Sequence, residues 1–588
     1  MNHVINVLEI FMRKILICLL LIIFITSPVI AENTKKVALV MKALSNPFFI
    51  KMKEGARQYS KKHDIPFEVF GVERETDVKR QTSIVENLIA RKYAAIVIAP
   101  VDSKELIPAC KKAIDNGIVV INIDNPLHKA TLKKLNITIP FVGSDNYKGA
   151  SLVGDYLRKK ISNKGRVIVI EGIRGVENAD LRKKGFIDTI TKENEIKIVA
   201  MESANWHTDE AFSLLTNLIQ KHGEIDAIFC ANDNMAIGAL QSLDMFGMTG
   251  QVWIGSYDNI DEVRLEMRNK RIHATVEQHP ELMGEYGVML AVNGLQGKSI
   301  PQMTATPLDL ITYDSFEKKV ALSLADDTPF FKTLLEGATL AADLFGMRLI
   351  SIIAKNDEAK QLNDIQSFIT NKPDIIIINP THSETILPAI EIAHSEGIPI
   401  ITVDRKAAST ENILSHIESN NIDGGRMAGE YIVQKLGRKG NILEFEGVPG
   451  TSAAHDRGKG FNDTLQKYSK MNIVGHEVAF FDREKARSAM TRLLKSKIHI
   501  DAIFAHNDEM IIGAIQAYQS LNKPLPRVTV GFDAIPEAIS SIKKNLLTAT
   551  IAQNSQKMGF LAIQNAAKHL QGYKVDPMIL VDLLIIDK

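Results

Sequence analysis

The sequence predicts an α/β fold that occurs twice along the chain. Short apolar runs alternate with segments of helical spacing, a pattern typical of parallel sheets covered by helices on both faces. One stretch appears at residues 226–239 and again at 501–514, each time as an apolar run, an Asn-Asp pair and a helical segment. Asp258 likewise recurs 275 positions later as Asp533. We therefore predict that a whole domain has been duplicated.

In the first copy, apolar runs with the length of buried strands mark the sheets. The opening run at residues 37–40 leads to Asn46-Pro47 and then to a helix. Further strands are expected at residues 94–99, 118–123, 166–171, 227–229 and 252–256. Helical segments separate them, so the strands are expected to run parallel.

The second copy repeats this order. Strands are expected at residues 320–324, 374–378, 399–403, 441–445, 502–504, 528–531 and 581–586. A polar stretch at residues 312–318 separates the apolar run at 308–311 from the next opening strand. The predicted organisation is a first module at residues 35–311, a linker at 312–318 and a second module at 319–588.

Residues 1–31 have the features of a secretory signal peptide, with Met12 as an alternative start. A basic segment at residues 12–14 precedes an apolar run at 15–25, and Val29-Ile30-Ala31 fits a small-residue cleavage site. The apolar run is short for a membrane span, which leaves an uncleaved anchor as the alternative. Cleavage would release the protein outside the cytoplasm, and we expect it in the periplasm.

The composition argues against several classes of protein. Lys and Arg together number 70 and Asp and Glu 69, a net charge of +1, so nothing favours nucleic acid as a partner. The three cysteines include no CxxC pair and predict neither a disulfide framework nor a metal site. Cys110 and Cys230 fit small buried hydrophobes. No cofactor is indicated.

Polar side chains gather at the ends of the predicted strands, where open α/β sheets bind their ligands. In the second copy they are Asn379, Asp404, Arg405, Asn507 and Asp533, with Gln553 in a further apolar run and Phe330, Phe331 and Phe481 beside strand ends or loops. Amide, carboxylate and guanidinium groups can each hold two sugar hydroxyls, and aromatic rings cover the C–H faces of a sugar. This set predicts a sugar site.

Each of these residues taken alone also has a structural explanation. An Asn or Asp after a strand commonly caps the following helix, and paired phenylalanines commonly belong to the core. The sugar interpretation gains weight because five such positions fall along one edge of the sheets and recur in the other copy.

The second copy, from about Lys318 to Lys588, resembles the bacterial periplasmic ribose-binding proteins. The likeness rests on Ala-Thr-Ile-Ala-Gln553, His-Asn507-Asp508-Glu-Met, Ile-Asn379-Pro-Thr, Val-Asp404-Arg405 and Gly447-Val-Pro-Gly450-Thr-Ser-Ala-Ala. The resemblance implies sugar contacts at Phe330, Phe331, Asn379, Asp404, Arg405, Arg457, Phe481, Asn507, Asp533 and Gln553. Thr328 stands where the family has Asn, which leaves the preferred sugar open.

The first copy, from about Lys35 to Ile311, is similar to the allose-binding branch of the same superfamily. The likeness rests on Lys42-Ala-Leu-Ser-Asn46-Pro-Phe48-Phe49, Cys-Ala-Asn232-Asp-Asn-Met and Ala-Thr-Val-Glu-Gln278. The implied contacts are Lys42, Asn46, Phe48, Phe49, Asp124, Asn125, Arg182, Trp206, Asn232, Asp258 and Gln278.

Several of these positions differ between the copies. Ala99 stands for Asn379, Asn125 for Arg405 and Trp206 for Phe481, and Lys42 has no lysine counterpart. We expect the two modules to prefer different sugars, or the first to tolerate a larger one, because unpaired buried polar groups penalise the wrong ligand.

The resemblance also implies the architecture. We expect two tandem type I periplasmic-binding-protein modules, each of two doubly wound parallel-sheet lobes joined by a three-strand hinge. The hinges are placed near residues 144–146, Gln278 and Asp309, and near 419–421, Gln553 and Asp582. Sugar contacts from both lobes would favour a closed form, which the membrane permease of an ABC-type importer would recognise.

Other classes fit less well. An enzyme is not favoured, because the chain lacks HExxH, GxSxG, the Walker spacing and a Cys/His cluster. A sugar-responsive repressor would need a basic surface and a helix-turn-helix before the first module, where this chain has the predicted signal peptide instead. A binding protein that presents its sugar to a chemoreceptor or sensor kinase uses the same cleft and is the alternative to uptake.

Overall fold

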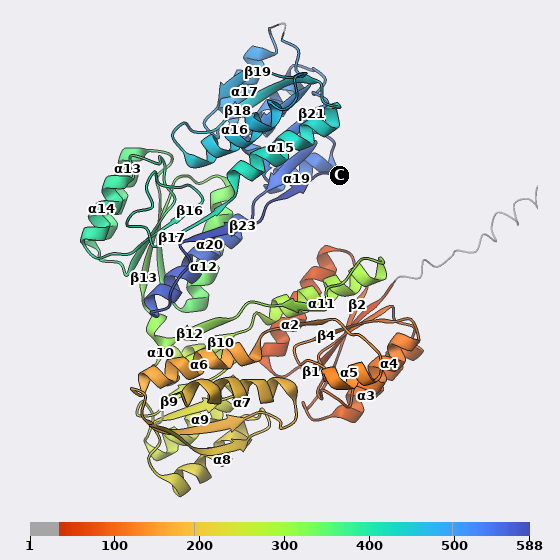
Figure 1. The fold of residues 1–588 in the computed structure, drawn as a ribbon, viewed down its shortest axis with the longest axis vertical. Coiled ribbons are helices and arrows are strands. Elements are labelled where there is room, and N and C mark those ends of the chain that lie inside the picture. Colours follow the sequence, from red (N-terminus) through yellow and green to blue (C-terminus); the bar gives the residue numbers. More distant parts are fainter. Residues whose placement is uncertain (1–34, 193–194, 497) are drawn as a thin grey trace, which may run out of the picture. The chain divides into compact units, whose positions relative to one another are not determined.

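The computed structural model describes residues 35–192, 195–496 and 498–588, and the predicted signal peptide lies outside these ranges. The chain divides into two compact units (Figure 1). One runs to Glu266 and includes Ala274–Leu310, and the other comprises Met267–His273 and Ile311–Lys588. Each unit holds two six-stranded sheets, so the predicted class of two tandem modules with two lobes each is confirmed.

The first lobe of unit 1 has the strand order β11-β5-β4-β3-β1-β2. Its strands are β1 (Val37–Ala43), β2 (Phe67–Val72), β3 (Ala95–Ile98), β4 (Val119–Ile123), β5 (Phe141–Gly143) and β11 (Met303–Ala305). Its helices are α2 (Pro47–Lys62), α3 (Val78–Ala90), α4 (Ile107–Asp115), α5 (Lys129–Lys134) and α11 (Pro280–Leu295). Alternate residues of β1 pack against α2 and α11 on one face and against α3 and α4 on the other.

The second lobe of unit 1 has the order β12-β10-β9-β8-β6-β7. Its strands are β6 (Gly165–Glu171), β7 (Ile196–Ser203), β8 (Ala227–Cys230), β9 (Trp253–Gly255), β10 (Ala274–Glu277) and β12 (Asp309–Thr312). Its helices are α6 (Asn146–Lys160), α7 (Glu177–Ile190), α8 (Thr208–His222), α9 (Asp233–Phe246) and α10 (Asp261–Arg268).

Unit 2 repeats this plan, and its first lobe has the order β14-β13-β15-β16-β17-β23. The strands are β13 (Lys319–Leu324), β14 (Arg348–Ile353), β15 (Ile375–Ile378), β16 (Ile400–Val403), β17 (Ser415–Ser419) and β23 (Met578–Val581). The helices are α12 (Pro329–Phe345), α13 (Glu358–Thr370), α14 (Leu387–Ser395) and α20 (Ser555–Leu570).

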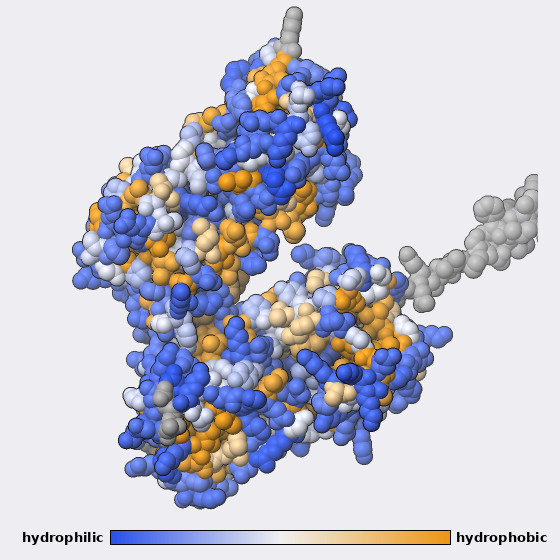
Figure 2. Space-filling model, in the orientation of Figure 1, coloured by the Kyte–Doolittle hydropathy of each residue, from blue (hydrophilic) through white to orange (hydrophobic). Residues whose placement is uncertain are grey.

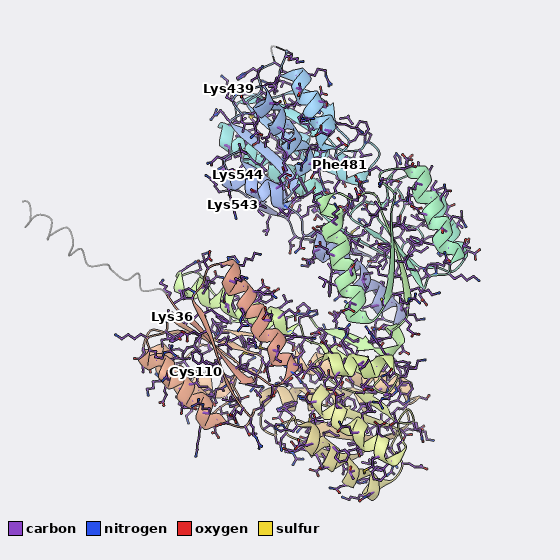
Figure 3. All side chains as sticks on the ribbon, turned by 180° about the vertical axis from the view of Figure 1, so that it is seen from behind. Lys36, Cys110, Lys439, Phe481, Lys543 and Lys544 are labelled. Carbon is purple, nitrogen blue, oxygen red and sulfur yellow. The ribbon has the colours of Figure 1, made fainter. Side chains whose placement is uncertain are left out.

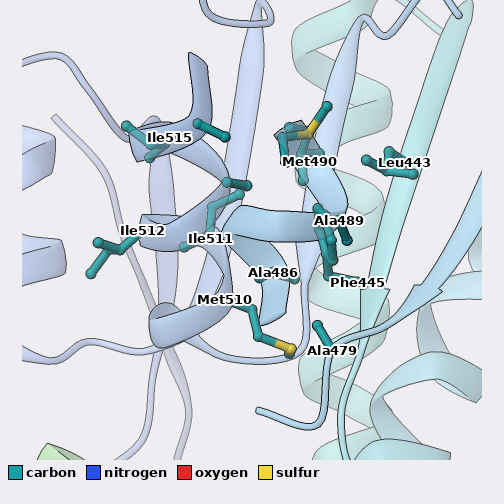
Figure 4. Close-up of a cluster of buried hydrophobic side chains, with 14 of the residues drawn as sticks. Leu443, Phe445, Ala479, Ala486, Ala489, Met490, Met510, Ile511, Ile512 and Ile515 are labelled. Atoms are coloured by element: carbon teal, nitrogen blue, oxygen red, sulfur yellow. The ribbon is translucent and has the colours of Figure 1, made fainter. Parts of the chain in front are cut away.

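The second lobe of unit 2 has the order β19-β18-β20-β21-β22-β24, in which β24 alone runs antiparallel to its neighbour. The strands are β18 (Gly440–Glu446), β19 (Met471–Val478), β20 (Ala502–Ala505), β21 (Val528–Asp533), β22 (Ala549–Ala552) and β24 (Leu584–Ile586). The helices are α15 (Asn421–Leu436), α16 (Ser452–Leu465), α17 (Arg483–Leu493), α18 (Asp508–Ser520) and α19 (Pro536–Lys543). Figure 4 shows one of its cores, where α17 and α18 meet Leu443 and Phe445 of β18.

The chain crosses between the two lobes of each unit three times. In unit 1 the crossings follow β5, β10 and β11, and in unit 2 they follow β17, β22 and β23. The prediction of one strand at residues 581–586 is therefore wrong. Asp582 and Leu583 lie between β23 and β24, which belong to different sheets.

Besides the interior strands β5 and β17, four further strands were not among those expected from the sequence: β2, β7, β14 and β19. Each lies at the edge of its sheet and is only partly buried. Edge strands carry polar residues and lack the continuous apolar run of a central strand, so the pattern that marks the central strands does not mark them.

The stretch expected to be the linker is partly ordered into short elements. β12 extends to Thr312, and a 3-10 helix, η1 (Tyr313–Ser315), follows it. The Ser315 hydroxyl donates to the carbonyl oxygens of Thr312 (2.7 Å) and Phe345 (2.8 Å).

Figure 2 shows hydrophilic residues over most of the visible face, with smaller hydrophobic patches between them. In the described ranges, no helix combines the length and hydrophobicity that a membrane crossing requires.

Candidate ligand-binding clefts

A pocket lies between the two lobes of unit 2, at the carboxyl ends of its central strands. It encloses about 360 Å³, part of it open to solvent. It is lined by Asp326, Thr328, Phe330, Phe331, Asp404 and Arg405 from the first lobe, by Ala453, Arg457, Phe481, Asn507 and Asp533 from the second, and by Gln553 at a crossing. The fold thus brings together nine of the ten residues proposed for this site.

The tenth, Asn379, is fully buried behind the pocket and does not line it. Its amide nitrogen donates to Asp404 Oδ2 (3.0 Å) and to the carbonyl oxygen of Val403 (2.8 Å). Its amide oxygen accepts from the backbone N–H of Ala325 (3.2 Å). Asn379 therefore orients the Asp404 carboxylate and ties together the ends of three strands.

Arg405 is positioned by the first lobe. Its Nη1 donates to Asn356 Oδ1 (3.2 Å) and to the carbonyl oxygen of Pro380 (3.4 Å). Its guanidinium lies 5.5 Å from the ring centre of Phe331 and 5.4 Å from that of Phe481, which belongs to the other lobe. Figure 3 labels Phe481 where the two lobes of unit 2 meet. Flat apolar faces from both lobes therefore flank this planar cation.

The opposite wall is built around Arg457 on α16. Its Nε donates to Asn421 Oδ1 (2.8 Å) and its Nη1 to the carbonyl oxygen of His506 (2.5 Å), while the guanidinium stacks 3.9 Å from the ring centre of Phe532. Nη1 also lies 3.7 Å from Asp533 Oδ1. These contacts hold the guanidinium plane still, with hydrogen-bonding capacity directed at the pocket.

Asn507 combines capping with pocket lining. Its side-chain oxygen accepts from the backbone N–H of Met510 (3.0 Å) as the N-cap of α18, and its amide nitrogen donates to the carbonyl oxygen of Phe481 (3.2 Å). Asn507 therefore caps α18, as the structural explanation expected, and it also lines the pocket.

The carboxylates of this pocket are buried. Burial raises the pKa of Asp404, and the nearby Arg405 and Arg457 partly oppose that rise. Burial likewise raises the pKa of Asp533, against the pull of Arg457 and of a hydrogen bond from Gln553 (2.7 Å). The low-polarity surroundings make any further hydrogen bond to these groups strong.

Unit 1 has a pocket at the equivalent place, enclosing about 260 Å³. It is lined by Lys42, Asn46, Phe48, Phe49, Glu75, Asp124, Asn178, Arg182, Trp206, Asn232 and Asp258. Asn125 and Gln278, which were also proposed as contacts, do not line it. Gln278 instead accepts from the Ser144 hydroxyl (2.6 Å) and donates to Asp258 Oδ1 (2.7 Å).

Asn125 has a supporting position. Its amide nitrogen donates to the carbonyl oxygen of Pro100 (3.1 Å), and its oxygen accepts from the Ser103 hydroxyl (3.3 Å) and from the backbone N–H of Asn178 (3.4 Å). Unit 2 places the Arg405 guanidinium against its pocket. At the same position unit 1 has the shorter Asn125, whose amide supports the pocket wall from behind.

The first lobe of unit 1 holds a compact cluster of charges. Lys42 Nζ lies 2.9 Å from Asp124 Oδ2 and 3.8 Å from Glu75 Oε2, and 5.5 Å from the ring centre of Phe49. Asn46 donates to Glu75 Oε1 (3.5 Å) and also caps α2 through the backbone N–H of Phe48 (3.0 Å). Burial raises the pKa of Glu75, and Lys42 opposes that rise.

Sequence reasoning missed Glu75, Asn178, Asp326 and Ala453 as pocket residues. Glu75 follows β2, an edge strand that the apolar pattern does not mark. Asp326 follows the opening strand β13, and its place directly after an apolar run was a usable signal.

The second lobe of unit 1 mirrors that of unit 2. Arg182 Nε donates to Asn146 Oδ1 (2.7 Å) and Nη1 to the carbonyl oxygen of Ala231 (2.8 Å). The guanidinium lies 3.8 Å from the ring centre of Tyr257 and 5.6 Å from that of Trp206. The same polar framework is thus kept while the facing aromatic ring is enlarged.

Two buried acceptor atoms in the pockets, one in each unit, have no hydrogen-bond donor within the described part of the chain. They are Gln553 Oε1 in unit 2 and Asn178 Oδ1 in unit 1. A buried acceptor without a donor costs about 1–3 kcal/mol. A ligand rich in O–H groups would satisfy these atoms.

Two lobes joined by three crossings, with a polar and aromatic pocket between them, define a cleft-type binding protein. A family model described as "Periplasmic binding protein domain" matches residues 37–299 and again residues 320–574. The chain belongs to this family and carries two copies of its domain.

Known relatives match about half of the chain, as a duplication requires. The "Ribose import binding protein RbsB" of Haemophilus influenzae is 42% identical over 275 residues, 47% of this chain and 93% of the relative. The "D-ribose/D-allose-binding protein" of Pseudomonas aeruginosa is 39% identical over 294 residues, 49% of this chain and 92% of the relative. A crystal structure of an ABC transporter periplasmic solute binding protein from Actinobacillus succinogenes with bound D-allose has 34% identity and a TM-score of 0.46, covering 47% of this chain and 98% of that chain.

Proposed function

We propose that this protein binds monosaccharides of the ribose and allose type outside the cytoplasm and delivers them to an ABC-type importer. The observation that carries the proposal is the composition of the two pockets. Each places carboxylates, amides and at least one arginine around aromatic rings, and each leaves a buried acceptor in need of a donor. Vicinal hydroxyls and apolar ring faces are the chemistry that such a pocket recognises.

The relatives support this proposal independently. Two proteins named for ribose import or for ribose and allose binding are 39–42% identical to this chain over more than nine-tenths of their own length. The family is one of binding proteins, which agrees with pockets in which every charged group has a hydrogen-bonding or ion-pairing role.

We assign the sugar contacts to the residues that line each pocket, with Asn379, Asn125 and Gln278 in supporting roles. Access requires the lobes to separate, because Asp404, Arg405 and Arg457 are each only 3% exposed. Sugar bridging both lobes would then stabilise the closed form. The three crossings are the segments that must bend.

We further propose that the two clefts select different sugars. In unit 1 a cation from β1, Lys42, pairs with Glu75 and Asp124. In unit 2 the anion Asp326 stands near that place, and the cation, Arg405, follows β16. The first-lobe walls of the two pockets therefore offer charged groups at different positions. Each wall should favour a sugar whose hydroxyls match those positions.

Calorimetric titration of the mature protein with ribose, allose and related pentoses and hexoses tests the proposal. We expect saturable heats for at least one sugar. Heats of a sugar bound by unit 2 should be lost in Asp404→Ala, those of a sugar bound by unit 1 in Asp124→Ala, and all of them in the double variant. Unchanged heats in both single variants would overturn the site assignment.

Cell experiments separate uptake from sensing. If the protein serves an importer, deleting it should abolish growth on the sugar at low concentration. Normal growth with lost chemotaxis or lost induction would instead favour the chemoreceptor or sensor-kinase role.

A further inference from the structure

A second group of ligating side chains lies in unit 2, outside the pocket. It consists of Glu444 and Glu446 on β18 and His476 on the neighbouring edge strand β19. Glu444 and His476 are direct partners in the parallel register. Glu446 lies two residues further along β18, so all three side chains project from the same face of the sheet.

The spacing of these groups suits a small cation. His476 Nδ1 is 3.0 Å from Glu444 Oε2 and 3.0 Å from Glu446 Oε1, and one ligand atom from each residue lies within 4.8 Å of the others. A tetrahedral ion with bonds of about 2.0–2.2 Å holds its ligand atoms roughly 3.3–3.6 Å apart. Small side-chain rotations would therefore seat an ion among them.

The charge of the cluster also favours a cation. Glu444 is fully buried, and the contacts of its carboxylate in the described residues are His476, His506 Nε2 (2.9 Å) and the amide of Asn462 (3.0 Å). No lysine or arginine of the described chain forms an ion pair with Glu444 or Glu446. Two carboxylates and a neutral imidazole would balance a divalent ion.

Unit 1 supplies an internal comparison, because its strands β6 and β7 carry the same positions 275 residues earlier. Val169 and Met201 stand there in place of Glu444 and His476. The remaining acid, Glu171, is the counterpart of Glu446. Unit 1 therefore lacks two of the three ligands.

In unit 1 the remaining acid, Glu171, forms ion pairs with two cationic side chains. Lys183 Nζ lies 3.0 Å from Glu171 and Arg174 Nη2 lies 3.4 Å from it. The corresponding positions in unit 2 are Gly458 and Pro449. Unit 2 has thus lost both cations of this surface and gained a second carboxylate and histidines.

We propose that Glu444, Glu446 and His476 form a binding site for a divalent first-row transition cation, with Zn²⁺ as the best fit. One imidazole with two carboxylates suits these ions, whereas Ca²⁺ and Mg²⁺ prefer sites made of oxygen alone. The His476 side chain is 48% exposed, so the ion can enter from solvent and water can complete its shell. His506 orients Glu444 from behind.

The test uses the full chain, purified without a histidine tag and treated with a chelator. Calorimetry with ZnCl₂ is expected to reveal one saturable site, and Co²⁺ to give visible absorption bands. His476→Ala and Glu446→Gln should each weaken Zn²⁺ binding by at least about tenfold.

Two controls keep the result specific to this cluster. His499→Ala removes an exposed histidine that also contacts an aspartate, Asp501 (3.0 Å), and Glu171→Gln changes the matched acid of unit 1. Both should bind Zn²⁺ like the wild type. The proposal fails if the wild type shows no saturable binding, if His476→Ala binds as tightly as the wild type, or if Ca²⁺ binds as tightly as Zn²⁺.

Discussion

The repeated Asn-Asp pair divides two roles between neighbouring residues. Asn232 lines the pocket of unit 1 and caps α9 through the backbone N–H of Met235 (2.9 Å). Asp233 is fully buried and accepts from the Thr275 hydroxyl (2.8 Å) and the backbone N–H of Ile260 (2.8 Å), which fastens the next loop. Burial raises the pKa of Asp233 to about 7. One residue lines the pocket while the next holds the wall behind it.

The buried carboxylates should dominate the affinity of each cleft. We expect Asp404→Asn to weaken sugar binding in unit 2 by about 10–100-fold, because a hydrogen bond to a charged group is worth roughly 1.5–3 kcal/mol. Asp124→Asn is the matched change in unit 1 and should leave unit 2 untouched. Calorimetry on both variants checks this, and equal losses in both clefts from one substitution would contradict it.

A histidine at a crossing of unit 1 predicts a pH-dependent stability. His279 Nε2 lies 2.8 Å from Asp309 and Nδ1 3.3 Å from Glu281, with Glu277 nearby. Burial alone would lower the pKa of His279, but these acids raise it from its ordinary value of 6.5 to about 10. Protonated His279 therefore stabilises the folded unit fully below about pH 6.5, and this contribution is lost as the pH rises through about 10.

The counterpart of His279 in unit 2 is Asn554, which makes His279→Asn the natural variant. The wild type should exceed it in unfolding free energy by up to a few kcal/mol near pH 6.5, since each pKa unit is worth about 1.4 kcal/mol. Urea unfolding at pH 6.5, 8 and 9.5 measures the difference, which should shrink as the pH rises. A constant difference would argue that His279 acts through packing alone.

At the scale of elements, the first lobe of each unit contains two helices whose backbones pack closely against each other. In unit 1 a Cβ on Gly55 of α2 would lie 2.0 Å from the carbonyl oxygen of Glu281 on α11. In unit 2 a Cβ on Gly337 of α12 would lie 1.9 Å from the carbonyl oxygen of Gln556 on α20. Backbone cannot move aside as a side chain can, so these positions require glycine.

Enlarging Gly337 should therefore separate α12 from α20. We expect Gly337→Ala to lower the unfolding free energy of unit 2 by about 1–3 kcal/mol, the usual cost of overpacking. Glu336→Ala, one position earlier on the exposed side of α12, should change it by less than about 0.5 kcal/mol. Chemical denaturation compares the two, and similar small effects would refute the packing argument.

The central strands with continuous apolar runs and the strand-end residues were open to sequence reasoning, whereas the short interior strands β5 and β17, the edge strands β2, β7, β14 and β19, and some pocket residues were not. Continuous apolar runs such as 375–378 announce burial on both faces. The half-exposed β19, which supplies His476, has no such signature. Glu75 escaped notice for the same reason, since it follows the edge strand β2. A pocket residue is therefore hard to predict from sequence when the strand that positions it has no apolar pattern.

At the scale of the whole molecule, two copies of one fold carry two different pockets. We expect calorimetric unfolding to show two transitions, and a sugar selected by one cleft to raise one of them. At a sugar concentration of 100 times Kd the stabilisation should be about 2.7 kcal/mol. Asp404→Asn should reduce the stabilisation of unit 2 alone, to about 0.4–1.4 kcal/mol for a site weakened 10–100-fold. Equal shifts of both transitions by one sugar would indicate that the clefts share a specificity.

The duplication, the α/β class and the line of polar residues at the strand ends follow from the order of residues alone. These features depend on periodicity and on repetition, which a linear sequence records directly. The order of residues alone does not separate the residues that line a pocket from the residues that support it. Asn379 and Asp404 both follow central strands, yet only Asp404 faces the cleft. The crossing at Asp582 and the grouping of Glu444, Glu446 and His476 likewise depend on which strands become neighbours, and that is settled only when the sheets assemble.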